Sequence, residues 1–366
     1  MKILHLSRAV ELEKFIGSLV GTAVGDSIGE FVLRACLGQL GSSKRPESVD
    51  RSFVETIVEQ TSLLRYTDDT AMAIGLAESI LARSAVDPQH LGGRFHANFN
   101  REPWRGYADG PGMVFLTVEA QNVPYTEAAW QVGNALYGPP GSFGNGASMR
   151  IAPLGLYYWD QADLYQHARD SALPTHTHPI AIDGAAVLAK AVAQAVSPGT
   201  ADGFDRRSFL IELHDFARTL EMRSKIELII ELCSRGVPEQ EAAFQLGQGV
   251  ATHESVPFAL YSFVMHPHSF EDCLFCAVTN GGDSDTVGAM ACAVSGAFLG
   301  QRAIPRRWKT RLENLDYLLK LANWLWARKS GSRVPRRREL RRCIETWDRE
   351  VEQAAAEQLE ELQPLD

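Results

Sequence analysis

Two short acidic segments, far apart in the sequence, carry residue types that can hold a metal ion. Thr67-Asp68-Asp69 and Asp283-Ser284-Asp285-Thr286 each open an apolar segment with helical periodicity. A helix start needs one side-chain oxygen as a cap, and each segment supplies several. Asp and Thr oxygens suit hard cations. We therefore expect one oxygen-rich site for divalent metal formed by Thr67, Asp68, Asp69, Asp283, Asp285 and Thr286.

The alternative for these segments is ordinary helix capping. Capping explains one acidic residue at each helix start, but it explains adjacent acidic residues less well. Carboxylates crowded together repel each other, and two divalent cations would match the four anionic ligands in charge. Ligand type does not distinguish magnesium from manganese. The pair Gly281-Gly282 would let the backbone turn sharply into the second helix.

The elements that must position these residues are helices. Alternating β-branched segments are nearly absent, and Ala and Leu recur with helical periodicity. Gly17, Gly21 and Gly25 lie at four-residue spacing, and 286–300 is rich in small residues, so we expect two central, closely packed helices. The expected helices are 10–24, 70–84, 111–122, 126–137, 161–172, 180–196, 205–219, 225–235, 239–248, 255–265, 269–280, 286–300 and 312–329.

The bulk composition excludes several classes of protein. The chain has 366 residues and a net charge of −9, which argues against broad nucleic-acid or membrane binding. Its scattered cysteines indicate free thiols in a reducing compartment. The apolar stretch 15–33 contains Asp26 and Glu30, so we expect a buried helix and a cytoplasmic, monomeric protein. One domain is expected over 1–330, followed by a charged, helical tail over 331–366.

Eight segments of the chain form a distinctive set when taken in order. They are Gly25-Asp26-Ser27-Ile28-Gly29, 66–72, 105–107, 141–146, 149–150, 175–176, 254–257 and 281–286. Together they resemble the ADP-ribosylglycohydrolase family over roughly residues 12–328. The details are most similar to the branch that acts on serine-linked and polymeric ADP-ribose. The resemblance implies an all-α fold, a compact orthogonal helical bundle, with two magnesium ions in a cleft.

The resemblance also implies a role for individual residues. One metal would be bound by Thr67, Asp68, Asp69 and Asp285, and the other by Asp283, Asp285 and Thr286. The metals would hold the ribose hydroxyls and orient water beside the C1″ bond. ADP-ribose, free or on a protein, would contact Gly110, Tyr137, Gly141, Ser142, Phe143, Gly144, Asn145 and His176. Tyr137 and Phe143 would flank the adenine, and the glycine-rich segment would face the diphosphate.

One position departs from the family pattern. A glutamate is expected seven residues after Asp26, but Leu33 stands there. Glu30 is one helical turn earlier and could reach the same space. In the first hypothesis the chain is a hydrolase that uses Glu30, Asp68 or Asp69 in catalysis. The alternatives are a catalytically weakened module that binds ADP-ribose and, less favoured, a phosphoesterase with the same metals. The acceptor, which could be serine, arginine, polymer or a metabolite, is left open.

Overall fold

All regular secondary structure in the described part of the chain is helical, which confirms the predicted all-α class. A computed structural model describes residues 2–38, 49–197, 203–332 and 337–361. Beyond the helices, two isolated bridges pair Leu64 with Leu312 and Gly144 with Ala251. The helices are α1 (Lys2–Cys36), α2 (Arg51–Glu59), α3 (Asp68–Arg83), α4 (Pro88–Arg101), α5 (Asp109–Gln121), α6 (Tyr125–Tyr137), α7 (Gly146–Met149), α8 (Ala152–Tyr157), α9 (Leu164–Ala172), α10 (Pro179–Val196), α11 (Arg206–Phe216), α12 (Leu220–Arg235), α13 (Glu239–Leu246), α14 (Thr252–Met265), α15 (Phe270–Val278), α16 (Ser284–Leu299), the 3₁₀ turn η1 (Gln301–Ala303), α17 (Arg306–Lys309), α18 (Leu315–Lys329) and α19 (Arg337–Glu361).

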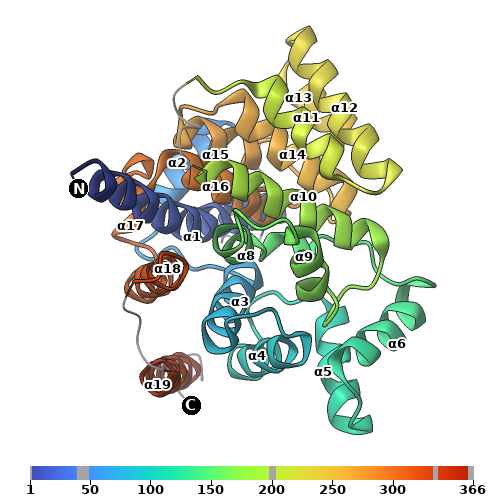
Figure 1. Cartoon of the computed structure of the whole chain (residues 1–366), viewed down its shortest axis with the longest axis vertical. Helices are drawn as coiled ribbons and strands as arrows, with labels where there is room; N and C mark the ends of the chain where they lie inside the picture. Colours follow the sequence, from blue (N-terminus) through green and yellow to red (C-terminus); the bar gives the residue numbers. More distant parts are fainter. Residues whose placement is uncertain (1, 39–48, 198–202, 333–336, 362–366) are drawn as a thin grey trace.

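The centre of the bundle is the pair α1 and α16, which run side by side through the middle of the molecule (Figure 1). Their backbones touch because glycines face the partner helix. A Cβ atom on Gly17 would lie 2.3 Å from the carbonyl oxygen of Gly296, and one on Gly25 would lie 2.1 Å from that of Gly288. The small residues noticed in the sequence therefore serve close helix packing, as expected.

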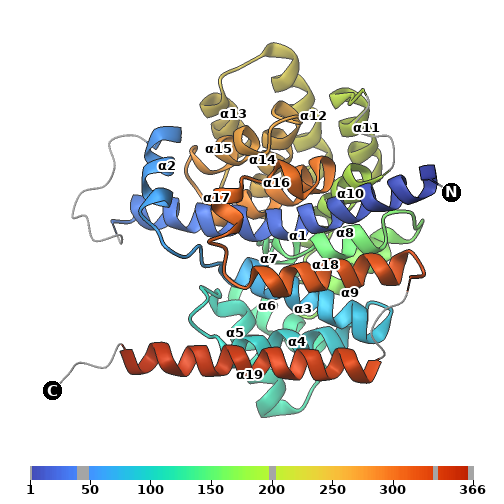
Figure 2. The same ribbon diagram turned by 90° about the vertical axis from the view of Figure 1, so that its left-hand side faces the viewer.

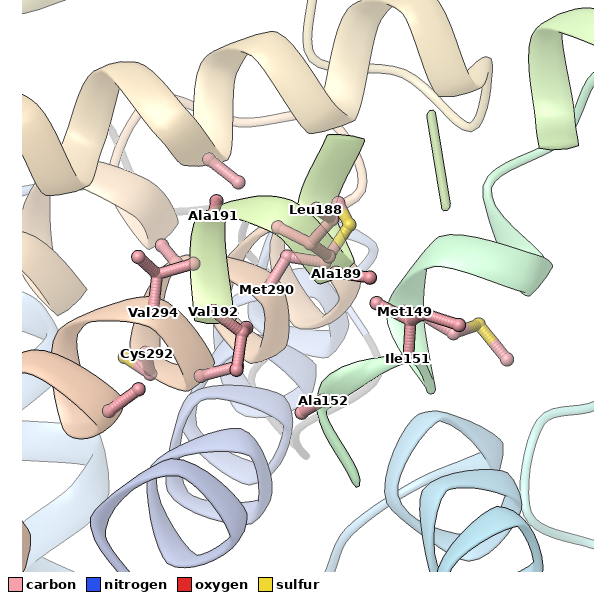
Figure 3. Close-up of a cluster of buried hydrophobic side chains, with 14 of the residues drawn as sticks. Met149, Ile151, Ala152, Leu188, Ala189, Ala191, Val192, Met290, Cys292 and Val294 are labelled. Atoms are coloured by element: carbon pink, nitrogen blue, oxygen red, sulfur yellow. The ribbon is translucent and has the colours of Figure 1, made fainter. Parts of the chain in front are cut away.

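Around this pair, apolar helices complete the core. Helix α10 packs against α16 and against the short helices α7 and α8. Figure 3 shows buried side chains of these four helices in one cluster, among them Leu188, Met290, Met149 and Ala152. Helices α1 and α10 contain windows long and apolar enough to cross a membrane, but 83% and 78% of these windows is buried inside the protein. Packing in the core therefore accounts for their apolar composition. The six cysteines are thiols rather than disulfides.

The structure differs from the predicted helices in two respects. The predicted helix 10–24 and the buried helix expected over 15–33 are parts of one helix, α1, which extends from Lys2 to Cys36. Contact with α16 supports the glycines that would end an isolated helix. Helices α2, α4, α8 and α17 were not predicted. The sequence of α4 contains Gly92, Gly93 and several polar residues, so its apolar periodicity is weak, although Asp87 and Pro88 form a standard start.

The C-terminal helix α19 lies along one side of the bundle, beside α3 and α4 (Figure 2). One face is buried and contains Leu340, Ile344, Trp347 and Val351, a spacing that places them on one helical stripe. The ring of Trp347 stacks on Tyr317 with a centroid distance of 4.2 Å. The described residues 337–361 form a helix that packs on the protein along this stripe. Its separation from residues 1–330 as a domain stays a prediction.

Candidate active site

The two acidic segments stand at the starts of helices that point into one cavity. Thr67 is the N-cap of α3, and Asp68 and Asp69 lie in its first turn. Asp283 is the N-cap of α16, and Asp285 lies in its first turn. The cavity has a volume of about 490 Å³, and its lining includes Asp68, Asp69, Asp283, Asp285 and Thr286. Acidic side chains from two segments more than 200 residues apart, predicted to share one site, thus line the same cavity in the structure.

Asp26 holds the first of these segments in place. It is fully buried in α1, and its carboxylate accepts the backbone N–H groups of Thr67 and Thr70, at 3.0 Å each, and the Thr70 hydroxyl at 2.6 Å. The backbone at Gly29 passes so close to α16 that a Cβ atom would lie 2.2 Å from the Ser284 carbonyl oxygen. The Gly25-Asp26-x-x-Gly29 segment therefore connects both halves of the site.

The second acidic segment enters its helix through a turn that needs glycine. Gly281 and Gly282 have φ values of +85° and +72°, in the left-handed region. A Cβ atom on Gly282 would lie 2.1 Å from the Gln248 carbonyl oxygen, and the same oxygen accepts the N–H of Asp283 at 2.8 Å. The sharp turn predicted at the paired glycines is confirmed.

The carboxylates of the cavity repel one another in a poorly solvated place. Burial, and then the charges of Asp26 and Asp283, raise the pKa of Asp68 to about 8. Burial and the neighbouring aspartates likewise raise the pKa of Asp69 and of Asp285 well above its ordinary value. Such a cluster disfavours its own ionised form unless a cation compensates the charge.

The donor set fits divalent cations. The Oδ1 atoms of Asp69 and Asp285 are buried and have no hydrogen-bond partner among the described residues. Unpartnered buried carboxylate oxygens are costly, and an oxygen-binding cation would satisfy both the atoms and the charge. All proposed ligands are hard oxygen donors, which is the chemistry of magnesium and manganese.

We expect the metal-free protein to lose stability as the pH rises, because protonation of the cluster relieves its repulsion. An unfolded aspartate has a pKa near about 3.9, whereas burial raises that of folded Asp68 to about 8. The contribution of Asp68 to the free energy of unfolding is therefore fully present below about pH 4, and it is lost as the pH rises to about 8. In EDTA, thermal denaturation should show a falling Tm across this window.

Magnesium should reverse this loss. At about 100 times its Kd it should add about 2.7 kcal/mol of stability at pH 8, and it should add less at pH 5, where protons compete for the ligands. An Asp68→Asn variant should show a shallower pH dependence in EDTA. A magnesium shift that is equal at both pH values would contradict this account.

The glycine-rich segment lines the same cavity but differs in detail from what the resemblance implied. Ser142, Phe143, Gly144 and Asn145 line the cavity, and Gly141 has a φ of +105° and lies against Gly133. The helix that follows, α7, is a single turn. The N–H groups of Gly144 and Asn145 are donated to Ser142 Oγ and the Val250 carbonyl, so these two do not face a diphosphate.

Asn145 turns toward the acidic cluster. Its side-chain amide donates to Asp283 Oδ2 at 2.6 Å and to Ser255 Oγ at 3.0 Å. The sequence predicted a contact of Asn145 with the substrate, whereas in the structure this side chain connects the glycine-rich loop to Asp283. It therefore joins the glycine-rich loop directly to the acidic cluster, and both of its amide donors are used within the protein.

Aromatic side chains stand at the open rim of the cleft. Tyr137 and Phe143 are about half exposed, at 53% and 45%, and both line the cavity together with Gly110. A Cβ atom on Gly110 would lie 3.4 Å from the Tyr137 hydroxyl, so glycine keeps the wall open at this point. Two exposed rings at a cleft rim can hold a planar base.

Arg150, a buried cation beside the cleft, received no role in the sequence analysis. Arg150 is fully buried, lines the cavity and donates to the Thr175 hydroxyl at 2.8 Å. Burial lowers its pKa to about 9. The neighbouring His176 is buried too, and burial together with Arg150 lowers its pKa to about 3, so it is a neutral imidazole. The Met149-Arg150 segment was noticed in the sequence, but nothing in its pattern indicated that the arginine faces a cavity.

Glu30 stands at a second cavity beside the acidic cluster. It lines that cavity with Thr67, whereas Leu33 lies outside the lining of both cavities. Its carboxylate pairs with Arg34 at 2.8 Å. Burial raises its pKa, and its charge contributes to raising that of Asp285. Glu30 thus faces the acidic cluster from α1, one helical turn before the position where the resemblance led us to expect a glutamate.

This helical fold, with two acidic helix starts facing one cleft, belongs to a known class of enzyme. Residues 7–335 match the model of the ADP-ribosylglycohydrolase family, and the chain belongs to that family, whose members are hydrolases acting on ADP-ribosyl linkages. The family and enzyme class predicted from the sequence are confirmed.

The chain is similar to particular members of this family. It is 32% identical over 334 residues to ADP-ribosylhydrolase ARH3 of Homo sapiens, covering 84% of this chain and 91% of the relative. It is 31% identical to ARH3 of Danio rerio, covering 86% and 90%. A solved structure described as an ADP-ribosylglycohydrolase-related protein complex superposes with a TM-score of 0.63 at 26% identity, covering 87% of this chain and 99% of that one.

Proposed function

We propose that this chain is a magnesium-dependent hydrolase that cleaves the bond between C1″ of ADP-ribose and a protein side chain. The observation that carries the proposal is that Asp68, Asp69, Asp283, Asp285 and Thr286 converge in the lining of one cavity that also contains the rings of Tyr137 and Phe143. Thr67 caps the helix that begins with Asp68 and Asp69. A divalent cation held there would supply Lewis-acid polarisation of the ribose hydroxyls and of water. The similarity to ARH3 proteins supports an ADP-ribosyl substrate.

The cleft has a chemically suitable surface for each part of ADP-ribose. Tyr137 and Phe143 offer ring faces to adenine. Arg150 is buried behind the cavity wall, and its positive charge favours the negative diphosphate between adenine and the distal ribose. The acidic cluster, with bound cations, would hold the hydroxyl groups of the distal ribose. This combination of aromatic, cationic and acidic groups supports a substrate that has both a base and a terminal sugar.

Hydrolysis adds a hydroxyl group from water to C1″ and a proton to the departing side-chain atom. Glu30 is the residue placed for these proton movements, because its carboxylate is half-buried, faces the cluster and has a pKa raised by burial. Asp68 and Asp69 are the alternatives from the sequence, but they are also proposed metal ligands. The position of Glu30 supports a working hydrolase over a module that only binds ADP-ribose.

The direct test is release of free ADP-ribose. The protein is incubated with magnesium and peptides carrying ADP-ribose on serine or on arginine. We expect release from at least one peptide, abolished by EDTA. An Asp283→Ala, Asp285→Ala double variant that is folded serves as the control. Release from neither peptide beyond the level of this control would disprove the hydrolase, and binding of ADP-ribose without release would identify a binding module.

Replacing Glu30 by glutamine should lower kcat by roughly 10²- to 10⁴-fold, the usual contribution of a positioned acid or base. KM should change little, because glutamine keeps the shape of the side chain. The matched control is Leu33→Glu, which should neither raise the activity of the wild type nor rescue Glu30→Gln, since Leu33 is outside both cavities. Steady-state kinetics with the better peptide measures this. Full activity of Glu30→Gln would exclude the role.

Removing the ring of Phe143 should weaken ADP-ribose binding by about 1–3 kcal/mol, the range for one base stacked on an aromatic side chain. Calorimetric titration of Phe143→Ala with ADP-ribose measures the change. Trp130→Ala is the control, because Trp130 is also exposed, at 56%, but does not line the cleft. Equal losses in both variants would indicate a nonspecific effect on the fold.

A further inference from the structure

A second cavity, of about 630 Å³, adjoins the acidic cluster. Glu30, Thr67 and Gly106 line it, and Gly106 also lines the first cavity. A Cβ atom on Gly106 would lie 3.8 Å from Asp68 Oδ1. The two cavities therefore adjoin at the carboxylates. If C1″ of the substrate lies there, the group attached to it extends into the second cavity.

Helix α19 supplies one wall of this second cavity, through Trp347, Glu350 and Val351. This helix begins at Arg337, after the segment that matches the family model. Contacts with the rest of the protein fix the position of α19 at this cavity. Trp347 is stacked on Tyr317, and Asp348 forms ion pairs with Arg94 and Arg101. The cavity is thus built jointly by the family fold and by a helix added to it.

The walls offer apolar surface and excess negative charge. Trp104 and Leu63 line the cavity with exposures of 49% and 38%. Glu350 is exposed and makes no ion pair with another described residue. The charged lining residues are four carboxylates and three guanidinium groups, namely Glu30, Glu102, Glu313, Glu350, Arg34, Arg65 and Arg105. Arg34 pairs with Glu30, and Arg105 pairs with Glu102 and Glu313.

This chemistry discriminates between acceptors. The lining has one more carboxylate than guanidinium groups, so it favours a cation over the diphosphate of a second ADP-ribose unit. A single hydroxyl or acetate would fill little of the volume. A polypeptide brings apolar side chains for Trp104 and Leu63, and it can bring a cation for Glu350.

We infer that the second cavity binds the polypeptide that carries ADP-ribose, with α19 as a specificity wall and Glu350 pairing with a cationic side chain beside the modified residue. This inference rests on the proposed function, which places C1″ at the acidic cluster. It concerns the acceptor, so it can fail while the hydrolase assignment stands.

A conjugate that cannot be hydrolysed tests the acceptor site independently of turnover. The probe is a peptide with lysine beside an ADP-ribosylated serine, in which a methylene group replaces the glycosidic oxygen. Calorimetry compares it with ADP-ribose in magnesium. We expect the conjugate to bind at least tenfold more tightly than ADP-ribose. Trp104→Ala and Glu350→Arg should each remove most of this gain while leaving the Kd of ADP-ribose unchanged.

The control variant is Glu345→Arg, on the same helix and exposed but outside the lining. It should bind the conjugate like the wild type. Two results would overturn this inference and leave the proposed function standing. One is an equal affinity of the wild type for the conjugate and for ADP-ribose. The other is a loss of conjugate affinity in Glu345→Arg as large as that in Glu350→Arg. Tighter binding of a methylene-linked ADP-ribose dimer than of the peptide would overturn it in favour of a polymer. If the wild type does not bind ADP-ribose at all, both the proposed function and this inference are wrong.

Discussion

An Asp285→Asn variant should lose at least about 10³-fold in kcat for ADP-ribose release while remaining folded. Asp285 lies in the first turn of α16, and its Oδ1 atom is buried without a partner among the described residues. Asparagine has the same shape but no charge, so the proposed metal ligands lose one anion. Metal polarisation of water and hydroxyl groups commonly supplies several kcal/mol to catalysis, and about 4 kcal/mol corresponds to a factor of about 10³.

The same variant should be more stable than the wild type when metal is absent. Burial and the charges of neighbouring carboxylates raise the pKa of Asp285 well above its usual range, so its removal relieves repulsion. We expect a gain of roughly 1–3 kcal/mol in EDTA at pH 8, the range for an uncompensated buried polar group. Magnesium should then stabilise the variant less than the wild type.

Kinetics and thermal denaturation together separate a metal ligand from a merely structural residue. Asp163→Asn is the control, because its side chain is 61% exposed and lies outside the cleft; it should match the wild type in both measurements. If Asp285→Asn were destabilised in EDTA and fully active when folded, Asp285 would be structural, and the metal site would be disproved.

Replacing Gly25 by alanine should destabilise the protein by about 3 kcal/mol or more. The added Cβ atom would lie 2.1 Å from the carbonyl oxygen of Gly288 and 2.9 Å from the N of Ala289. Both obstacles are backbone atoms of α16, which cannot rotate away as a side chain could. Inserting atoms into packed cores typically costs about 1–3 kcal/mol, and a rigid obstacle places this variant at or beyond the upper end.

Gly93→Ala provides a matched comparison for this substitution. Gly93 also lies inside a helix, α4, but a Cβ atom there would meet nothing within 4 Å. This variant should gain up to about 1 kcal/mol, because alanine is the better helix former. Urea denaturation measures both. A small effect at Gly25 would mean that α1 and α16 can separate without loss, against the packing described above.

Helices whose apolar residues recur with a clear period were predictable from the sequence, and the packed glycine faces of α1 and 286–300 were too. Helix α4 could not be predicted in this way. It depends on a contact of Gly92 with Tyr125, a residue of another helix, and the local sequence gives no sign of this contact. A Cβ atom on Gly92 would lie 2.3 Å from that ring. Helix ends likewise depend on tertiary support, as the continuation of α1 to Cys36 shows.

The acidic residues of the site could be predicted because they combine two local signals, a helix start and an excess of oxygen ligands. Residues that act through position alone could not. Arg150 became part of the cleft only through folding, and Asn145 donates to Asp283 across 138 residues of sequence. Glu30 could be proposed from helical spacing, because Asp26 and Glu30 lie on the same helix. The α19 wall had no local signal for its place beside the cluster.

The glycine contacts between α1 and α16 also fix the relative register of the two halves of the site. Gly17, Gly21, Gly25 and Gly29 each abut a backbone carbonyl of the partner helix, so sliding one helix would bring every contact out of alignment at once. A shift of one residue would displace Asp285 from Asp26 by about 1.5 Å along the axis, which is large compared with the tolerance of metal coordination. We therefore expect the proposed metal site to be sensitive to residues as distant as Gly17, so that mutations at the far end of the helix pair alter the site without touching it.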